Sequence, residues 1–392
     1  MKRLLFVDDE PNVLQALHRM LRSFRREWTM EFAEGGAKAL DLLARQPFDV
    51  VLTDMRMPGM DGAELLENVV RLYPGAVRIV LSGQCDRQSV LSCVGPAHQF
   101  LTKPCASETL RSTILRACSA CDRIIDQRHK RMLSRVTSIP SLPAVHAELI
   151  AELSSPQASV RSVAEIASRD AGIAAKILQL ISSSFFGSPQ QNPDITEAVK
   201  LLGLDTIKPL ALSRKVFVPF DRNAVDGGWL QERMDHGLAV GTAAKAIAEV
   251  ETADRALAGD AFLAGFLHEV GTLALVQPPA DSHGPPCHGE AASALAEETQ
   301  AEAGAYLMAL WGLPDRIVTA IALRHSPQRS ADREFTPLAA AHAAHAILNE
   351  TAGEMESSSA LSVDYLARIG CAERLDAWRE RCWAAVPEGA CP

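Results

Sequence analysis

The strongest constraint on the fold is that short apolar runs early in the chain each end on a polar residue. Residues 4–7 lead into Asp8 and Asp9, residues 49–53 into Asp54, residues 77–81 into Ser82, and residues 99–102 into Lys103. A weaker strand pattern covers residues 30–33. Between these runs the apolar residues recur with helical spacing, at 12–24, 37–44 and 63–72, and again from 107. Alternation of strands and helices predicts a parallel sheet covered by helices on both faces.

These polar residues are predicted to meet, because functional groups of a doubly wound sheet gather at the carboxyl ends of its strands. Several carboxylates at one point repel each other and require a divalent cation, and Mg²⁺ suits oxygen ligands. A carboxylate screened in this way can act as a nucleophile toward a phosphoryl group. The Lys103 ammonium and the Ser82 hydroxyl can then hold the phosphoryl oxygens. Asp8 and Asp9 could instead cap a helix before Pro11, but four strand ends in the right order favour the phosphoryl site.

Residues 3–118 resemble the receiver domain of two-component response regulators. The matching motifs are VDDE at 7–10, TDMRMPGMDG at 53–62, LSG at 81–83 and FLTKP at 100–104. The resemblance implies a flavodoxin-like (βα)5 fold and phosphorylation of Asp54 by a histidine kinase. It also implies Mg²⁺ on Asp8, Asp9, Asp54 and the backbone carbonyl of Arg56. The residues implied to bind the phosphoryl group or to switch on phosphorylation are Ser82, Lys103 and Phe100.

The rest of the chain shows helical spacing almost throughout, so the expected class is α/β plus all-α. A helical connector is expected at 119–137, and a helical C-terminal extension at 333–392. Residues 138–332 resemble the HDOD domain, an all-helical output module related to HD phosphohydrolases. The matching stretches are IPSLP at 139–143, IASRD at 166–170, SSFFG at 183–187, AVKLLG at 198–203, GFLHEVG at 265–271 and WGLP at 311–314.

The HD resemblance raises the question of catalysis in the helical half. A working HD site holds one or two metal ions on a His, a His-Asp pair and a further Asp, with bound water as the nucleophile. Here His236, His268 and His325 are candidate ligands, but the pair is His268-Glu269, and His342 stands where the final Asp is expected. HDOD domains are regarded as lacking the full metal set. We therefore predict a degenerate site in a non-enzymatic output module. The alternative is a phosphorylation-gated, metal-dependent phosphodiesterase or phosphohydrolase.

Composition limits the partners of the chain. The net charge is −9 and no long basic run occurs, which gives no support for nucleic-acid binding. No apolar run reaches the ~20 residues of a membrane span, and the apolar run at 4–7 is too short for a signal peptide. A cytoplasmic protein is therefore expected, with a histidine kinase and an unidentified downstream protein as partners. The apolar series at 110, 114, 121, 125 and 132 fits either a homodimer seam or packing within the chain.

Overall fold

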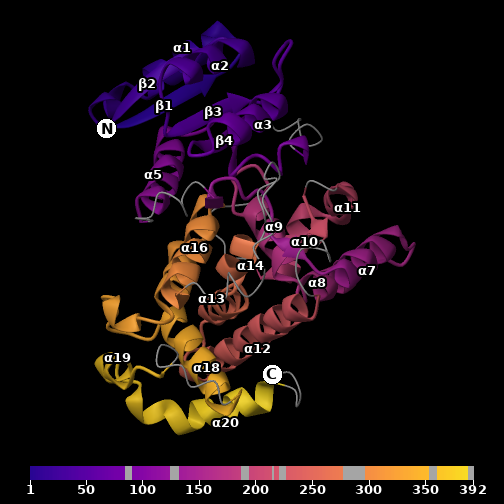
Figure 1. The fold of residues 1–392 in the computed structure, drawn as a ribbon, viewed down its shortest axis with the longest axis vertical. Coiled ribbons are helices and arrows are strands. Elements are labelled where there is room, and N and C mark those ends of the chain that lie inside the picture. Colours follow the sequence, from indigo (N-terminus) through magenta and orange to yellow (C-terminus); the bar gives the residue numbers. More distant parts are fainter. Residues whose placement is uncertain are drawn as a thin grey trace. The chain divides into compact units, whose positions relative to one another are not determined.

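The computed structural model describes residues 1–83, 91–123, 132–186, 194–213, 216–219, 227–276, 296–352 and 360–386 (Figure 1). The chain divides into two compact units. The first comprises Met1–Ser138, Gln179–Pro189 and Leu310–Gly312, and the second comprises the remaining residues. Part of the predicted connector, residues 124–131, lies outside the described residues.

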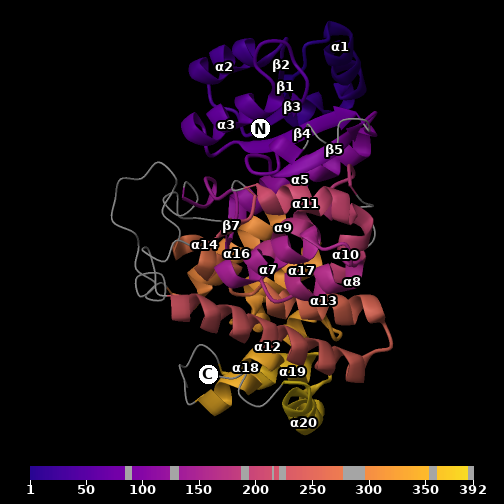
Figure 2. The same cartoon turned by 90° about the vertical axis from the view of Figure 1, so that its right-hand side faces the viewer.

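The first unit is built on a five-stranded parallel sheet with the strand order β2-β1-β3-β4-β5. The central strands are rich in Val, Leu and Ile and are buried along most of their length, as expected for strands covered on both faces. Figure 2 shows α2 and α3 on one side of this sheet and α1 on the other. The strands are β1 Lys2–Val7, β2 Trp28–Ala33, β3 Val50–Asp54, β4 Val77–Gly83 and β5 Gln99–Lys103. The sheet confirms the flavodoxin-like fold.

The helices of this unit are α1 Pro11–Met20, α2 Gly36–Arg45, α3 Gly62–Leu72 and α5 Ser107–Arg123. The helix predicted over residues 12–24 ends earlier, and a 3-10 helix at Arg22–Arg26 follows it. The tighter winding places residues three apart on one face, where Leu21 is fully buried and Phe24 is partly buried. Phe24 packs on Trp28, with ring centroids 5.4 Å apart.

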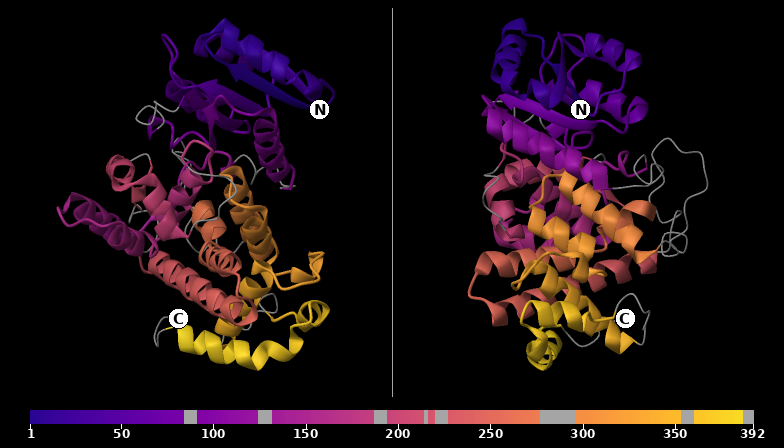
Figure 3. Two further views of the ribbon diagram at one scale, coloured as in Figure 1. Left: turned by 180° about the vertical axis from the view of Figure 1, so that it is seen from behind. Right: turned by 90° about the vertical axis from the view of Figure 1, so that its left-hand side faces the viewer.

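The second unit is helical, as predicted, with one addition. A two-stranded parallel pair joins β6 Pro140–Ser141 to β7 Val218–Pro219. The helices are α7 Pro143–Ser154, α8 Val160–Ala167, α9 Ala171–Ile181, α10 Ile195–Leu202, α11 Leu204–Leu212, α12 Gly227–Glu251, α13 Arg255–Phe266, α14 Val270–Val276, α16 Glu297–Leu310, α17 Asp315–Leu323, α18 Pro337–Ala352, α19 Val363–Arg368 and α20 Leu375–Ala385. The last residues of α9 and α16 belong to the first unit. In Figure 3, α18 and α20 lie beside α12, so the C-terminal residues are part of this unit's packing.

The apolar stretch at residues 256–275 forms two helices, α13 and α14, and not one continuous helix. The break follows Phe266, where Leu267 leaves the helical conformation with φ −92° and ψ 4°. The ring of His268 donates to the Gly265 carbonyl at 2.5 Å, which gives that carbonyl a side-chain partner at the helix end. By length and composition alone, Arg255–Val276 could cross a membrane, but 89% of its most apolar window is buried, as in the core helix of a globular protein.

Glycines allow α12 and α13 to pack closely. A Cβ atom on Gly265 would lie 2.7 Å from the Cα of Gly241, and one on Gly241 would lie 2.9 Å from the carbonyl oxygen of Phe262. Both distances are shorter than side-chain carbons tolerate against backbone. Only hydrogen at these positions permits the contact, which lies next to His236 and His268 along the chain.

Candidate functional site

The first candidate site lies at the carboxyl edge of the sheet. Asp8 directly follows β1, and Asp54 is the last residue of β3. Lys103, the last residue of β5, donates from Nζ to Asp8 Oδ2 at 2.6 Å and also to Asp54 Oδ1. Asp8 is almost completely buried, and the backbone N–H of Glu10 donates to its Oδ1 at 3.0 Å. The structure therefore brings together three of the predicted residues around one ammonium group.

The loop after β3 holds the Asp54 carboxylate in place. The backbone N–H of Arg56 donates to Asp54 Oδ2 at 2.7 Å, and Gly62 N–H donates to the Met55 carbonyl at 2.9 Å. A Cβ on Gly62 would lie 2.2 Å from the Asp54 carbonyl oxygen, so this position needs glycine. Asp61 caps α3 by accepting from Glu64 N–H at 2.8 Å. The motif at 53–62 is thus a tight turn that fixes one carboxylate.

Burial and charge act against each other at this edge. Burial is the largest influence on the pKa of Asp54 and raises it, while Lys103 pulls in the opposite direction. Burial lowers the pKa of Lys103, but its hydrogen bonds to Asp54 and Asp8 outweigh that effect and leave the pKa raised. Lys103 therefore stays charged at neutral pH and screens the two carboxylates.

A hollow of about 510 Å³ opens beside Asp9 and Asp61. Asp8, Asp9 and Asp54 offer carboxylate oxygens and Arg56 offers a backbone carbonyl, and these are the oxygen donors that Mg²⁺ prefers. The donor chemistry therefore fits a hard divalent cation. The residues that line the hollow are Asp9, Met55, Arg56, Met57, Pro58, Asp61 and Ser92.

The two predicted switch residues are buried. Ser82 pairs in register with Thr102 on β5, one residue before Lys103. Phe100 is fully buried, and its ring meets that of Phe186 edge-on with centroids 6.3 Å apart. Thr102 Oγ1 donates to the Ser184 carbonyl at 2.9 Å. Residues 179–189 belong to the same compact unit as the sheet, so β5 is covered by a segment distant in sequence.

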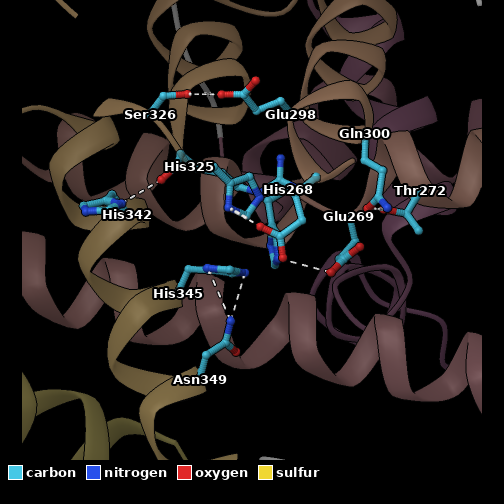
Figure 4. Close-up of polar contacts among 12 residues, drawn as sticks. His268, Glu269, Thr272, Glu298, Gln300, His325, Ser326, His342, His345 and Asn349 are labelled. Atoms are coloured by element: carbon cyan, nitrogen blue, oxygen red, sulfur yellow. Dashed lines mark hydrogen bonds and ion pairs between the residues drawn. The ribbon is translucent and has the colours of Figure 1, made fainter. Parts of the chain in front are cut away.

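The second candidate site is a cluster of histidines in the helical unit. His236 lies on α12, His268 just after α13 and His345 on α18, and one ring nitrogen of each lies within 4.8 Å of the other two. His325 lies next to this group, with its ring centroid 5.2 Å from that of His345. Figure 4 shows His268, His325 and His345 turned toward one another. The predicted ligands His236, His268 and His325 are thus brought together.

His342 does not join the cluster, although the sequence placed it at the missing Asp position. Its Nδ1 donates to the Arg324 carbonyl at 2.6 Å, and its Nε2 accepts from Ser362 N–H at 2.9 Å. Both ring nitrogens are therefore used by the backbone, and the ring lies apart from the others in Figure 4. His345, three residues later, lies in the cluster instead. The sequence carried a signal for it, since two histidines stand three apart on one Ala-rich helix.

Glu269 is held as a buried anion. Its pKa would be raised by burial, but the nearby His268 and Arg233 outweigh this effect and hold the pKa well below its usual range. Arg233 Nη1 lies 3.5 Å from Glu269 Oε1, and His268 Nε2 lies 3.4 Å from the same oxygen. Burial lowers the pKa of His236 to about 3 and that of His325 to about 2, so both rings are neutral at physiological pH.

The chain matches two domain families. The response regulator receiver domain model matches residues 4–115, and the HDOD domain model matches residues 139–327. The hydrogenase transcriptional regulatory protein HoxA of Cupriavidus necator is 33% identical over 178 residues, which are 42% of this chain and 36% of that protein. The transcriptional regulatory protein GlrR of Escherichia coli is 32% identical over 134 residues, which are 33% of this chain and 29% of that protein.

Among solved structures, the chain is similar to the signal receiver domain of an HD domain-containing protein from Pseudomonas fluorescens Pf-5. The two are 32% identical over 29% of this chain and 91% of that one, with a TM-score of 0.28. The chain spans only about a third of the length of the curated relatives it matches.

Proposed function

Because the chain is a response regulator that joins a receiver domain to an HDOD domain, we propose that Asp54 accepts a phosphoryl group and thereby switches the helical output unit. The observation that carries this proposal is the position of Lys103, whose ammonium reaches both Asp8 and Asp54. Such a bridge holds a nucleophilic carboxylate and a cation side by side at one strand edge. This arrangement suits phosphoryl transfer, which depends mainly on positioning and on charge stabilisation.

In the proposed reaction an Asp54 carboxylate oxygen attacks the phosphorus of the kinase's phosphohistidine. A P–O bond to Asp54 forms as the P–N bond breaks, and the imidazole leaves. Mg²⁺ held by Asp8, Asp9, Asp54 and the Arg56 carbonyl would neutralise negative charge on the transferred group. Lys103 would hold one phosphoryl oxygen as a point charge, and the Ser82 hydroxyl would donate to another.

The output step is proposed to run through Phe100. Its ring lies against Phe186, and Phe186 lies within the residues that the HDOD model matches. A shift of Ser82 and Phe100 toward a phosphorylated Asp54 would change this ring contact and the neighbouring bond from Thr102 to Ser184. A coupling of about 1–3 kcal/mol is enough to change populations five- to 150-fold. The altered HDOD surface would then act by binding a downstream protein.

We propose that the helical unit does not hydrolyse a phosphoester. The acidic member of the expected pair, Glu269, is engaged by Arg233 and His268. The rings of His236, His268 and His345 are 1–7% exposed, which leaves a substrate no direct approach to them. The competing proposal, a gated phosphodiesterase, requires water and substrate at this cluster.

Several further assignments belong to the same proposal. The receiver domain would cover residues 3–118, the connector 119–137, the HDOD domain 138–332 and a C-terminal extension 333–392. We place the protein in the cytoplasm, where a histidine kinase can reach Asp54. Of the apolar series predicted as a homodimer seam or as packing within the chain, Leu110 and Ile114 are fully buried in the first unit, and residue 125 lies outside the described residues.

The test uses acetyl phosphate as the phosphoryl donor, with the full-length chain and Mg²⁺. We expect the intact mass of the wild type to rise by one phosphoryl group, and the Asp54→Asn variant to show no increase. Asp41→Asn is the matched control, since it removes an exposed carboxylate on α2 that does not line the hollow. This control should be phosphorylated like the wild type. Mg²⁺-dependent phosphorylation of Asp54→Asn at the wild-type level would refute Asp54 as the acceptor.

A further inference from the structure

We propose that His236, His268 and His345 form a binding site for one transition-metal ion in the core of the helical unit, with His325 as an adjacent fourth imidazole. The three ring nitrogens that would bind it lie within 4.8 Å of one another. Ligand nitrogens of a tetrahedral ion with metal–nitrogen bonds of about 2.0–2.1 Å lie about 3.4 Å apart. The cluster therefore needs only a small contraction of side chains to close around an ion.

The ligands come from α12, α18 and the turn that follows α13, and the fold packs these elements closely. The glycine contact between Gly241 and Gly265 fixes α12 against α13, and it lies within five residues of His236 and His268 along the chain. Helix α18, which carries His345, packs against both α12 and α13. A metal site requires ligands placed by rigid elements, and these three meet that requirement.

The orientation of His268 suits a metal ligand. Its Nδ1 donates to the Gly265 carbonyl at 2.5 Å, which fixes the orientation of the ring. Its other nitrogen, Nε2, lies 3.4 Å from Glu269 Oε1, an ion-pair distance. Histidines that bind metal ions in proteins commonly use one ring nitrogen for the ion while a backbone carbonyl or carboxylate holds the other.

His325 gives a second, independent indication. Its side chain is only 5% exposed, yet within the described part of the chain neither ring nitrogen forms a hydrogen bond. Its Nδ1 lies 3.0 Å from Glu297 Oε2, an ion-pair distance without hydrogen-bond geometry. Buried polar side chains are normally satisfied, and each exception requires an explanation. An ion shared with the neighbouring His345 would account for this one.

The chemistry of the ligands selects the ion. Imidazole nitrogen binds Zn²⁺, Ni²⁺, Cu²⁺ and Fe²⁺, whereas Mg²⁺ and Ca²⁺ require oxygen. Because the three rings are 1–7% exposed, the ion would be enclosed by protein, as in structural rather than hydrolytic zinc sites. We therefore assign the cluster a structural role, with Zn²⁺ as the probe.

The site also involves a part of the chain that the family match does not include. The HDOD model ends at residue 327, and His345 lies beyond it on α18. A bound ion would link the matched helices α12 and α13 directly to the following segment. The C-terminal extension would then be required for metal binding, and metal would in turn stabilise its docking.

The test is Zn²⁺ binding by the full-length, untagged chain after chelator treatment, in a buffer with Mg²⁺. We expect one Zn²⁺ retained per chain after desalting, measured by elemental mass spectrometry. His345→Gln should raise the Zn²⁺ dissociation constant at least about 100-fold, since it removes a ligand outright. His342→Gln is the matched control, a buried histidine on the same helix, and should stay within about threefold of the wild type. Asp9→Asn should retain Zn²⁺, which separates this site from the strand edge.

Co²⁺ substitution of the wild type guards against misfolded variants. A visible ligand-field spectrum with nitrogen donors, lost in both His236→Gln and His345→Gln, would support the site. A thiolate-to-cobalt charge-transfer band would locate the ion at cysteines and overturn the proposal. So would retention of less than about a fifth of an equivalent of Zn²⁺, or an equal loss in His342→Gln. Loss of phosphorylation at Asp54 would leave these outcomes unchanged.

Discussion

At the scale of single residues, Lys103 is the shared positive partner of two carboxylates, Asp8 and Asp54. One ammonium screens two carboxylates, and Asp8 among them is 4% exposed at its side chain. A buried anion without a partner costs several kcal/mol, so the site depends on this lysine whenever no cation is bound. In the proposed Mg²⁺ complex, the ion and Lys103 would be partly redundant sources of positive charge.

We predict that Lys103→Gln lowers the stability of the first unit by about 2 kcal/mol without Mg²⁺, because the two carboxylates lose their shared counter-charge. Adding Mg²⁺ should restore more stability in the variant than in the wild type. Thermal unfolding with and without Mg²⁺ measures both effects. Lys38→Gln is the control, since its ion pair with Glu34 is exposed and should be worth less than about 0.5 kcal/mol. Equal Mg²⁺ shifts in the wild type and Lys103→Gln would contradict the redundancy.

Asp170 in the helical unit is a buried carboxyl whose pKa is raised by burial and lowered by hydrogen bonds. Its side chain is fully buried and caps α9, with Oδ1 accepting from Ile173 N–H at 2.9 Å and Oδ2 from Leu142 N–H at 2.6 Å. Burial raises the pKa of this carboxyl to about 6, even though three backbone N–H groups oppose the shift. The folded protein thus holds a proton here at pH values where the unfolded chain has lost it.

Because the pKa of Asp170 is raised in the folded state, the free energy of unfolding should depend on pH. Between pH 4 and 6 the folded state binds more protons at Asp170 than the unfolded state, so this residue's contribution to stability falls as pH rises and is constant above 6. About two pKa units correspond to roughly 3 kcal/mol. We expect the stability of the wild type relative to Asp170→Asn to fall by that order between pH 4 and 7. Urea unfolding of both proteins at each pH measures the difference, and a pH-independent difference would show that Asp170 titrates normally.

At the scale of elements, the contact between α12 and α13 gives a matched pair of substitutions. In Gly265→Ala the new Cβ would meet the backbone of Gly241, which cannot move aside easily. We expect a loss of about 3 kcal/mol, as for severe overpacking. In Gly259→Ala, on the same helix, the Cβ meets nothing within 4 Å, and we expect a gain of about 0.5–1 kcal/mol from helix propensity. Urea unfolding that showed equal effects would refute the close contact.

The strands were predictable because their signal is local. Apolar runs of about five residues ending in a charged residue, as at Asp54, leave little choice of register in a sheet buried on both faces. The break between α13 and α14 was not predictable in this way, because both helices are apolar on all sides. That break depends on one hydrogen bond from the His268 ring to Gly265, a contact that periodicity does not reveal.

The histidine cluster was predicted only in part, and helix geometry explains why one of its members was missed. Residues three apart on a helix point in directions about 60° apart, so His342 and His345 both face inward but toward different neighbours. Which one meets His268 is decided by how α18 rotates against α12 and α13. The sequence pattern predicted His342 as a member of the cluster, whereas the packing of α18 brings His345 to it.

At the scale of the whole molecule, we expect the two compact units to unfold in separate steps, each stabilised by only one of the two proposed ions. We predict two thermal transitions, one raised by Mg²⁺ with beryllofluoride and the other raised by Zn²⁺. At a free Zn²⁺ concentration 100 times the dissociation constant the stabilisation is about 2.7 kcal/mol. Differential scanning calorimetry resolves the two transitions, with Asp54→Asn and His345→Gln each expected to abolish only one response. A single transition shifted by both ions would mean that the units unfold as one.

The first unit is assembled from three separate stretches of chain, which has a consequence for its biosynthesis. Residues 1–138 leave the ribosome before residues 179–189 have been translated, and domains generally begin to fold in the order of their synthesis. Until Phe186 has been translated, the side of β5 that carries Phe100 lacks the segment that covers it in the folded protein. A translational pause between residues 138 and 179 would therefore prolong the exposure of an apolar surface, and a chaperone that meets the nascent chain would find its binding site there.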